Sequence, residues 1–126
     1  MRGATLDSGA LIAFERGSGR MLALVERASG HDLRLAVPAG VVAQTWRGGP
    51  RQARLSRLLG APCVEVVALD ELEARAVGVV CGRSGATDVV DASVVVCARQ
   101  RGHQVVTGDP GDLRTIDPDL AVIAPG

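Results

Sequence analysis

The feature that most constrains the fold is a regular alternation of short apolar strand patterns with helical patterns along the whole chain. Strand patterns, bounded by turn residues, occupy residues 4–6, 32–37, 63–69, 105–106 and 120–124. Helical patterns with start and stop signals occupy residues 8–16, 20–28, 41–46, a segment beginning at Pro50, 70–81 and 88–101. Such an alternation predicts an α/β domain built on a mostly parallel sheet with right-handed crossovers.

Length and composition agree with one such domain. The chain has 126 residues, which is enough for one hydrophobic core and too few for two, so we expect a single domain over residues 1–126. Apolar residues make up 47% of the chain, yet there is one Phe, one Trp and no Tyr. The core is therefore expected to be aliphatic, as in buried parallel strands and the helices that cover them.

Composition also argues against several classes of protein. No apolar run approaches the roughly 20 residues that span a bilayer, and the chain opens with a strand pattern, so we expect a cytoplasmic protein with no membrane contact. Cys63, Cys81 and Cys97 lie far apart with no His nearby, which favours buried apolar residues over a zinc site. All 14 basic residues are Arg, which excludes a lysine mechanism, and the net charge is zero, so nucleic-acid binding would need a local patch.

Acidic residues stand where the predicted strands end and the predicted helices begin. Asp7 follows the first strand, Asp109 follows the fourth, and Asp112 lies one helical turn later. Asp88 and Asp91 open the helix that leads into the fourth strand. Because the carboxyl ends of parallel strands meet at one edge of a sheet, these acids are expected to converge there.

Each acid also has a purely structural interpretation. Asp is a preferred residue for capping a helix N-terminus. Asp7 could cap the first helix, Asp88 with Asp91 resembles a capping box, and Asp109 precedes a proline at a first helical position. Any one of these acids could therefore be only a cap, and the prediction of a site rests on their occurrence together.

Several carboxylates at one edge favour a divalent metal ion. Close carboxylates repel one another, and the repulsion raises their pKa values and destabilises the fold unless a cation neutralises them. Mg²⁺ or Mn²⁺ takes oxygen ligands and is commonly held by a few carboxylates together with a substrate phosphate. Such an ion could activate a water for attack on phosphorus.

Three motifs, in this order, resemble those of the PIN-domain family, and especially the VapC-type toxin ribonucleases. They are TLDSGALIAFERG at the start, VPAGVVAQTWRGG in the middle and TDVVDASVVVCARQRGHQVVTGDPGDL near the end. The resemblance spans nearly the whole chain. It implies a three-layer α/β/α fold with a sheet of four to five strands in the order 3-2-1-4-5.

The resemblance also implies an activity, a set of ligands and partners. It identifies Asp7, Asp91 and Asp109 as catalytic metal ligands for Mg²⁺ or Mn²⁺, with Asp112 as an auxiliary acid. Asp88, one helical turn from Asp91, is a further candidate ligand by its position alone. The implied function is that of an endoribonuclease, the toxin of a type II toxin-antitoxin pair, which cleaves RNA with a metal-activated water. The implied partners are RNA, an antitoxin whose segment lies in a hydrophobic groove, and a second copy of the chain in a homodimer.

One position departs from the family pattern. The family usually has a Glu in the short helix after the second strand, and this chain has Gln44 there. Our hypothesis is that the Gln44 amide oxygen still faces the site and that Asp88 restores the missing charge. The alternative is a weak or inactive PIN-like module that binds RNA or an antitoxin partner without cutting.

Other polar residues could support the site. Ser8 and Thr107 flank two proposed ligands and could orient a carboxylate, or they could satisfy helix-end N–H groups. Four arginines near the short helix could bind RNA phosphates, the last three from one helical face, or form an ordinary solvated face: Arg47, Arg51, Arg54 and Arg57.

The remaining aromatic and histidine residues are expected to be structural. Trp46 could stack on a base, but packing is the favoured interpretation. His31 and His103 are expected at the surface.

Two other α/β classes with acids at strand ends fit less well. A receiver domain needs adjacent acids after its first strand and a later Lys, and this chain has Leu6 before Asp7 and no Lys. A haloacid-dehalogenase-like phosphatase needs a second Asp two positions after the first, where this chain has Gly9.

Overall fold

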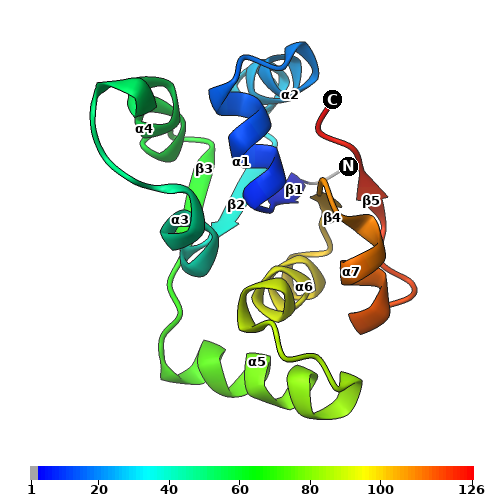
Figure 1. The fold of residues 1–126 in the computed structure, drawn as a ribbon. Helices are drawn as coiled ribbons and strands as arrows, with labels where there is room; N and C mark the ends of the chain where they lie inside the picture. Colours follow the sequence, from blue (N-terminus) through cyan, green and yellow to red (C-terminus); the bar gives the residue numbers. More distant parts are fainter. Residues whose placement is uncertain (1–2) are drawn as a thin grey trace.

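The computed structural model describes residues 3–126 and contains one five-stranded parallel sheet (Figure 1). The strands are β1 Gly3–Leu6, β2 Arg34–Pro38, β3 Val64–Val67, β4 Gln104–Val106 and β5 Val122–Ile123. The helices are α1 Ser8–Glu15, α2 Gly19–Gly30, α3 Ala39–Thr45, the 3-10 turn η1 Pro50–Gln52, α4 Ala53–Leu59, α5 Glu71–Ser84, α6 Val89–Arg101 and α7 Pro110–Ile116.

The strand order is β3-β2-β1-β4-β5, which confirms the expected order. Every neighbouring pair is parallel, with Thr5 opposite Ala36 on one side of β1 and Leu6 opposite Val106 on the other. The central strand β1 is therefore flanked by β2 and β4. This arrangement places the ends of β1 and β4, where two of the predicted ligands follow, side by side.

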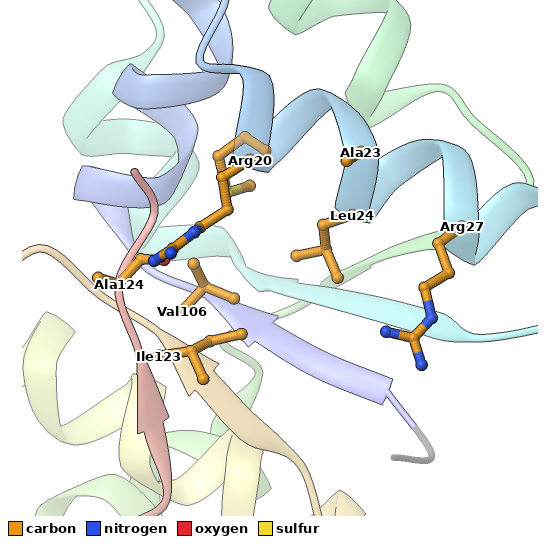
Figure 2. Close-up of a pocket in the computed structure, with 8 residues that line it drawn as sticks. Arg20, Ala23, Leu24, Arg27, Val106, Ile123 and Ala124 are labelled. Atoms are coloured by element: carbon orange, nitrogen blue, oxygen red, sulfur yellow. The ribbon is translucent and has the colours of Figure 1, made fainter.

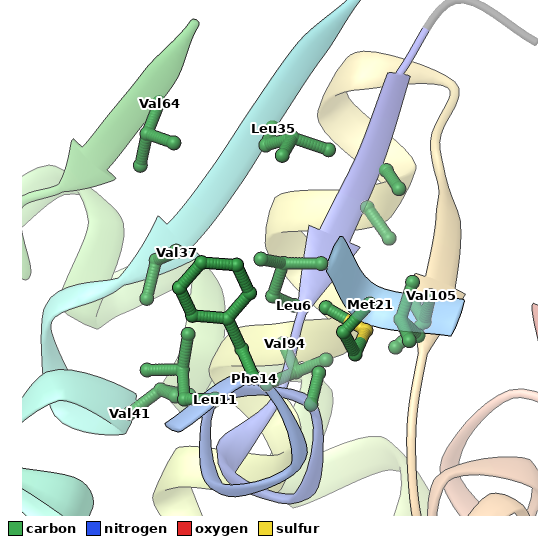
Figure 3. Packing of buried hydrophobic residues seen from close by; sticks show 14 of the residues in the cluster. Leu6, Leu11, Phe14, Met21, Leu35, Val37, Val41, Val64, Val94 and Val105 are labelled. Atoms are coloured by element: carbon green, nitrogen blue, oxygen red, sulfur yellow. The ribbon is translucent and has the colours of Figure 1, made fainter. Parts of the chain in front are cut away.

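Helices cover both faces of the sheet and form three layers. Helices α1, α2 and α4 lie over one face, and α6 lies against the other with α5 and α7 packed outside it (Figure 1). The main core joins α1 and α2 to the sheet, with Leu11, Phe14 and Met21 packed over Leu6 and Val37 (Figure 3). Among the described residues, Phe14 is the only aromatic side chain in this core. The rest of the core is aliphatic, as the composition predicted.

The helices α5 and α6 of the second half of the chain differ in how far they are buried. In α6 every residue from 92 to 98 is buried, because the helix lies between the sheet and the outer helices. In α5, by contrast, Leu72 and Val79 are exposed. Cys63 and Cys97 are buried as expected, while Cys81 on α5 is only partly covered.

Four local features differ from the sequence prediction. Strand β2 begins at Arg34, because Asp32 adopts a left-handed conformation with φ of 58°. Strand β3 ends at Val67 and β5 has only two residues. Pro50 begins the 3-10 turn and α4 starts at Ala53, so Arg51 does not share a helix with Arg54 and Arg57.

The last helix, α7, was not predicted as an element of its own. Pro110 supplies its start, and Leu113 is buried beneath it. Across the described residues, none of the helices combines the length and the hydropathy needed to cross a membrane.

Candidate functional site

The predicted acids line one cavity of about 390 Å³ beyond the carboxyl ends of β1 and β4. Its lining residues come from the start of α1, from α3, from the start of α6 and from the turn after β4 with the first turn of α7: Asp7, Ser8, Gly9, Ile12, Gln44, Asp88, Asp91, Gly108, Asp109 and Asp112. The structure thus brings together all five predicted acids, together with Gln44 and Ser8.

Asp7 forms the buried end of this acid cavity. Its backbone N–H donates to the Val106 carbonyl at 3.1 Å, which extends the β1–β4 pairing by one residue. Its carboxylate accepts from the Ala10 N–H at 3.0 Å and caps α1. The cap interpretation is therefore confirmed for Asp7, and the same side chain is a cavity residue.

The environment of Asp7 favours its protonated form. The side chain is only 8% exposed, and this burial raises the pKa of Asp7 above its usual value. Hydrogen bonds from Thr107, Ala10 and Gly9 oppose the rise, and the nearby charge of Asp109 adds to it.

Asp88 and Asp91 lie at the start of α6, where Asp88 is the N-cap and Asp91 is in the first turn. The Asp88 carboxylate accepts from the Asp91 N–H at 3.0 Å, which confirms the capping interpretation for Asp88. Burial is the largest of the effects that together raise the pKa of Asp91 to about 6, and the charges of Asp88, Asp112, Asp7 and Asp109 follow in that order. Asp91 is therefore the acid whose charge is least well accommodated by the protein alone.

Asp109 does not cap the helix that follows it. Within the described residues its side chain makes no cap hydrogen bond, so the cap interpretation is wrong for this residue. Instead, the Asp109 N–H donates to Oγ1 of Thr107 at 2.9 Å. Thr107 is 2% exposed and also hydrogen-bonds the Asp7 carboxyl, so it links the acids that follow β1 and β4.

At two places around the cavity, neighbouring segments approach each other closely. A Cβ added to Gly9 would lie 3.0 Å from the backbone N of Gly108, so only glycine lets α1 begin this close to the turn after β4. A Cβ added to Gly40 would lie 3.2 Å from a methyl group of Val90. The second approach brings α3, which carries Gln44, against the start of α6.

Sequence reasoning missed Gln52, a further residue that positions α3. Gln52 is 6% exposed and donates to the Thr45 carbonyl at 2.8 Å. Its Oε1 accepts from the N–H groups of Arg47 at 2.7 Å and Gly48 at 2.9 Å. A polar residue at the end of a 3-10 turn gives no sequence signal for such a role.

The four arginines of the predicted RNA surface lie outside the acid cavity. Arg47 donates to the carbonyls of Ala43, Gln44 and Trp46 and so closes the end of its own helix. Arg51, Arg54 and Arg57 are exposed, and Arg54 donates to the Glu15 carbonyl at 3.4 Å.

The remaining polar and aromatic residues lie away from the cavity. Trp46 follows α3 and is 40% exposed, so it is not part of the core. His31 is exposed as expected, whereas His103 is part-buried, with Nδ1 at 3.1 Å from Oγ1 of Thr5. His103 is therefore half-buried and not fully exposed, because its ring lies against Thr5 of β1.

The donor chemistry of the cavity fits a hard divalent cation. Its polar lining consists mainly of carboxylate oxygens, and the pKa values of Asp7 and Asp91 are raised first by burial and then by neighbouring negative charge, which a cation would neutralise. Among residues 3–126, however, no group of three or more His, Cys, Asp or Glu side chains is arranged to hold a metal ion as it stands. The carboxylates would therefore have to draw closer around an ion.

Comparison with known proteins connects this fold to solved structures. No protein-family model matches the sequence, and no curated protein matches it. The chain is similar to VapBC2 from Rickettsia felis bound to a promoter DNA fragment, with a TM-score of 0.68, 14% identity, and 96% and 97% of the two chains covered. It is also similar to FitAB bound to the IR36 DNA fragment, with a TM-score of 0.62, 17% identity, and 97% and 94% coverage.

A third similar structure is FitAcB from Neisseria gonorrhoeae, with a TM-score of 0.61, 20% identity and 97% of each chain covered. The likeness extends over nearly the whole of each chain, and the sheet order is the one that the resemblance implied. The protein therefore shares the α/β fold of these structures, which is the PIN-domain fold that the resemblance implied.

Proposed function

We propose that the protein is a metal-dependent endoribonuclease that acts as the toxin of a type II toxin-antitoxin pair. The observation that carries the proposal is the convergence of five carboxylates from three segments of the chain, before α1, at the start of α6 and after β4, on one cavity. Burial and mutual repulsion raise the pKa of Asp91 in that cavity to about 6. Groups whose pKa values are strongly perturbed in a cavity are candidates for catalysis.

Asp7, Asp91 and Asp109 would hold Mg²⁺ or Mn²⁺, with Asp88 and Asp112 as additional acids. When bound, such an ion would neutralise charge on the scissile phosphate and lower the pKa of a water molecule. Thr107 would orient the carboxylate of Asp7 and the backbone of Asp109 through the hydrogen bonds described above. Gln44 would present an amide oxygen to the cavity and Ser8 a hydroxyl group.

The proposed substrate is single-stranded or looped RNA, because unstacked nucleotides can enter an open cavity. Phosphates would be bound outside the acids, by the exposed Arg51, Arg54 and Arg57, with Arg47 nearer to Gln44. These cations are needed since the cavity itself is acidic and the net charge of the chain is zero.

The proposed protein partner is an antitoxin. The similar structures are complexes named FitAB and VapBC2, which supports a partner of this kind for the present chain. A homodimer is proposed as well, and the exposed apolar residues Leu72 and Val79 on α5 are compatible with a protein contact.

The decisive experiment is cleavage of a panel of tRNA and single-stranded RNA by purified protein free of any partner. We expect cleavage with Mg²⁺ or Mn²⁺, none with EDTA, and a loss of more than about 100-fold in rate for Asp7→Asn. Asn retains the ability to cap α1, so the variant should fold. Asp70→Asn is the matched control, because Asp70 caps α5 through the Glu73 N–H and does not line the cavity.

A second candidate function is a PIN-like module that binds RNA or a partner without cutting. It is favoured by Gln44, which lacks the charge of the family's usual Glu, and by the absence of a ready-made metal group among the described residues. Folded wild-type protein that binds RNA and leaves every RNA of the panel intact with either metal would establish this second function and reject the nuclease.

The arginine surface can be tested by RNA binding in EDTA. Replacing Arg51, Arg54 and Arg57 by Ala should weaken binding and reduce the slope of log affinity against log salt by about 2 to 3, since each phosphate contact releases roughly one counterion. Affinity and slope equal to those of the wild type would show that these arginines form only a solvated face.

A further inference from the structure

A second hollow lies beside the acid cavity, at the same edge of the sheet. The acid cavity lies beyond the carboxyl ends of β1 and β4, whereas this hollow lies beyond the end of β4 and beside β5, the next strand of the sheet. Its volume is about 300 Å³, and its lining consists of Thr107, Gly108, Pro110 and residues 122–126. We call it the β4–β5 hollow.

Gly108 forms the boundary between the two hollows and is the one residue that lines both. A Cβ added to Gly108 would have the Cα of Gly9, at 3.7 Å, as its one neighbour within 4 Å among the described residues, its chain neighbours apart. The boundary therefore carries no side chain and is not crowded. A nucleotide can cross it, with its phosphate at the acids and its base in the β4–β5 hollow.

Thr107 connects the β4–β5 hollow to the acids. Its backbone N–H donates to the Ile123 carbonyl at 3.0 Å, in the wall of the hollow. Its side chain hydrogen-bonds the Asp7 carboxyl and accepts from the Asp109 N–H at 2.9 Å. A group bound in the hollow is thus held at a defined position relative to two of the proposed metal ligands.

The residues that follow β5 are fixed by hydrogen bonds to α2 and its N-cap. Oγ of Ser18 donates to the Pro125 carbonyl at 2.8 Å. Arg20 extends from α2 to Ala124 and donates to its carbonyl at 3.3 Å (Figure 2). The far wall of the β4–β5 hollow is therefore already in place before a ligand arrives, and a preformed site loses little conformational entropy on binding.

The walls of the β4–β5 hollow suit a flat, largely apolar group. Val122 and Ile123 supply aliphatic surface, and Pro110 and Pro125 supply ring faces. No charged side chain is among its described lining residues. Apolar side chains can sandwich a nucleobase, as aromatic ones do. The volume lies at the lower end of the range for small-molecule sites, which suits a single nucleoside.

We infer that the β4–β5 hollow is a nucleoside subsite, which binds the base of a nucleotide next to the scissile phosphate. The inference rests on the proposed nuclease function, because the acid cavity is where that phosphate would lie. Base contacts specify a sequence, whereas phosphate contacts only position the strand. The hollow would therefore give the enzyme a preference for the base on one side of the cut.

The first test uses nucleosides, which carry no phosphate and can bind without a metal. The full chain in EDTA is titrated with uridine, cytidine, adenosine and inosine, and binding is followed by the amide signals in two-dimensional NMR. We expect saturable binding of at least one nucleoside with a Kd in the millimolar range, and shifts concentrated at residues 107–108 and 122–126. No saturable binding, or shifts concentrated elsewhere, would overturn the inference.

Filling the hollow should abolish this binding. Val122→Phe adds a ring on an edge strand, where Phe is well tolerated, and should raise Kd at least ten-fold. Val66→Phe is the matched control: it makes the same change on the other edge strand, at a residue that is 44% exposed and outside the hollow, and should leave Kd unchanged. An unchanged Kd for Val122→Phe would contradict the inference.

A second variant keeps the test valid if Val122→Phe disturbs folding. Pro110→Ala removes an exposed ring from the wall at the first position of α7, where Ala is accepted, and should raise Kd about three-fold. N-acetyl-leucine amide tests for a different ligand. If it binds the hollow as tightly as the best nucleoside does, the site is one for a protein side chain and the inference is wrong.

RNA cleavage gives an independent measure of the same subsite. Val122→Phe should raise KM about ten-fold and change kcat by less than about three-fold, because it removes binding that is made equally in the ground state and the transition state. A fall in kcat with KM unchanged would reject a binding role. The nucleoside titrations need neither metal nor cleavage, so a chain that cuts no RNA can still pass them, and failure of the proposed nuclease function is distinguishable.

Discussion

The acid cavity has two walls that are held in different ways. One wall, here called the strand wall, is made by the residues that follow β1 and β4 and carries Asp7 and Asp109. Its tightest approach is between two backbones, at Gly9 and Gly108. The other, the helix wall, is made by α3 and α6 and carries Gln44, Asp88 and Asp91. Its tightest approach is between Gly40 and the Val90 side chain.

This difference separates what is fixed in the site from what can adjust. A backbone in the middle of a hydrogen-bonded turn cannot rotate out of the way, whereas a valine side chain can change rotamer or shift slightly. Asp7 and Asp109 are therefore held in place by the sheet itself. Gln44, the one departure from the family pattern, lies on the wall that can adapt to it.

The largest effect should come from crowding the strand wall. In Gly9→Ala the new methyl group would meet Gly108 N at 3.0 Å and Oδ1 of Asp7 at 3.3 Å, so it would push apart the acids that follow β1 and β4. We expect cleavage to fall about 100-fold, because small misplacements of catalytic groups have effects of this size. Single-turnover cleavage of an RNA from the panel measures the loss.

Gly40→Ala is the matched control for this prediction on the helix wall. Its methyl group would meet the Val90 side chain, with the nearest methyl group at 3.2 Å, so cleavage should change by less than about three-fold. Equal losses in the two variants would show that the two walls do not differ in rigidity.

The next effect concerns the charge of the helix wall. Asp88→Asn keeps a capping residue at the start of α6 but removes one negative charge, so we expect the affinity for Mn²⁺ to fall roughly ten-fold. If Asp88 compensates for Gln44, the double variant Gln44→Glu/Asp88→Asn should regain most of that affinity. Isothermal titration of each protein with Mn²⁺ gives the comparison.

The single variant Gln44→Glu provides the other arm of the same experiment. Compensation predicts little change in Mn²⁺ affinity or cleavage for this variant. A large gain in both would show that the native site is impaired by Gln44, and the idea of compensation would then be wrong.

The smallest effect is on stability and depends on pH. The pKa of Asp91 is raised in the folded protein from 3.8 to about 6, so the folded state binds the proton more tightly than the unfolded state does. In EDTA, this group stabilises the fold fully below about pH 4, and its contribution is lost as pH rises through about 6. Asp91→Asn removes the penalty, and we expect its free energy of unfolding near pH 7 to exceed that of the wild type by about 1 kcal/mol after allowing for solvent screening.

Urea unfolding of both proteins between pH 4 and pH 7 checks the sign of this effect. The advantage of Asp91→Asn should grow over that range and should shrink when Mn²⁺ is added to the wild type, because the ion stabilises only the ionised carboxylate. A difference that does not vary with pH would mean that Asp91 is not destabilised by burial and repulsion.

Much of the fold followed from local patterns. The alternation of strands and helices, the aliphatic core and the ends of most helices depend on residues close in sequence, such as Asp7 and Asp88 as caps and Gly102 after α6. The same patterns gave the acids of the site, because an acid at the end of a parallel strand has its position fixed by the strand. The strand order came from the resemblance, and the structure agrees with it.

Other features depended on segments far apart in the sequence. Nothing near Asp109 revealed that its side chain leaves its own helix uncapped, or that His103 is enclosed beside Thr5. The position of Gln52 is likewise set by contact with α1, where its Nε2 donates to a Glu15 carboxylate oxygen at 3.4 Å.

The sequence by itself determined which residues could form helices, strands and a carboxylate site, since those properties reside in periodicity, capping and side-chain chemistry. Only the tertiary structure decided how close the acids come, which of them are buried and which wall can move. Those properties depend on backbone approaches such as Gly9 to Gly108, and on the desolvation that raises the pKa of Asp91. Both arise from contacts between segments that no local pattern encodes.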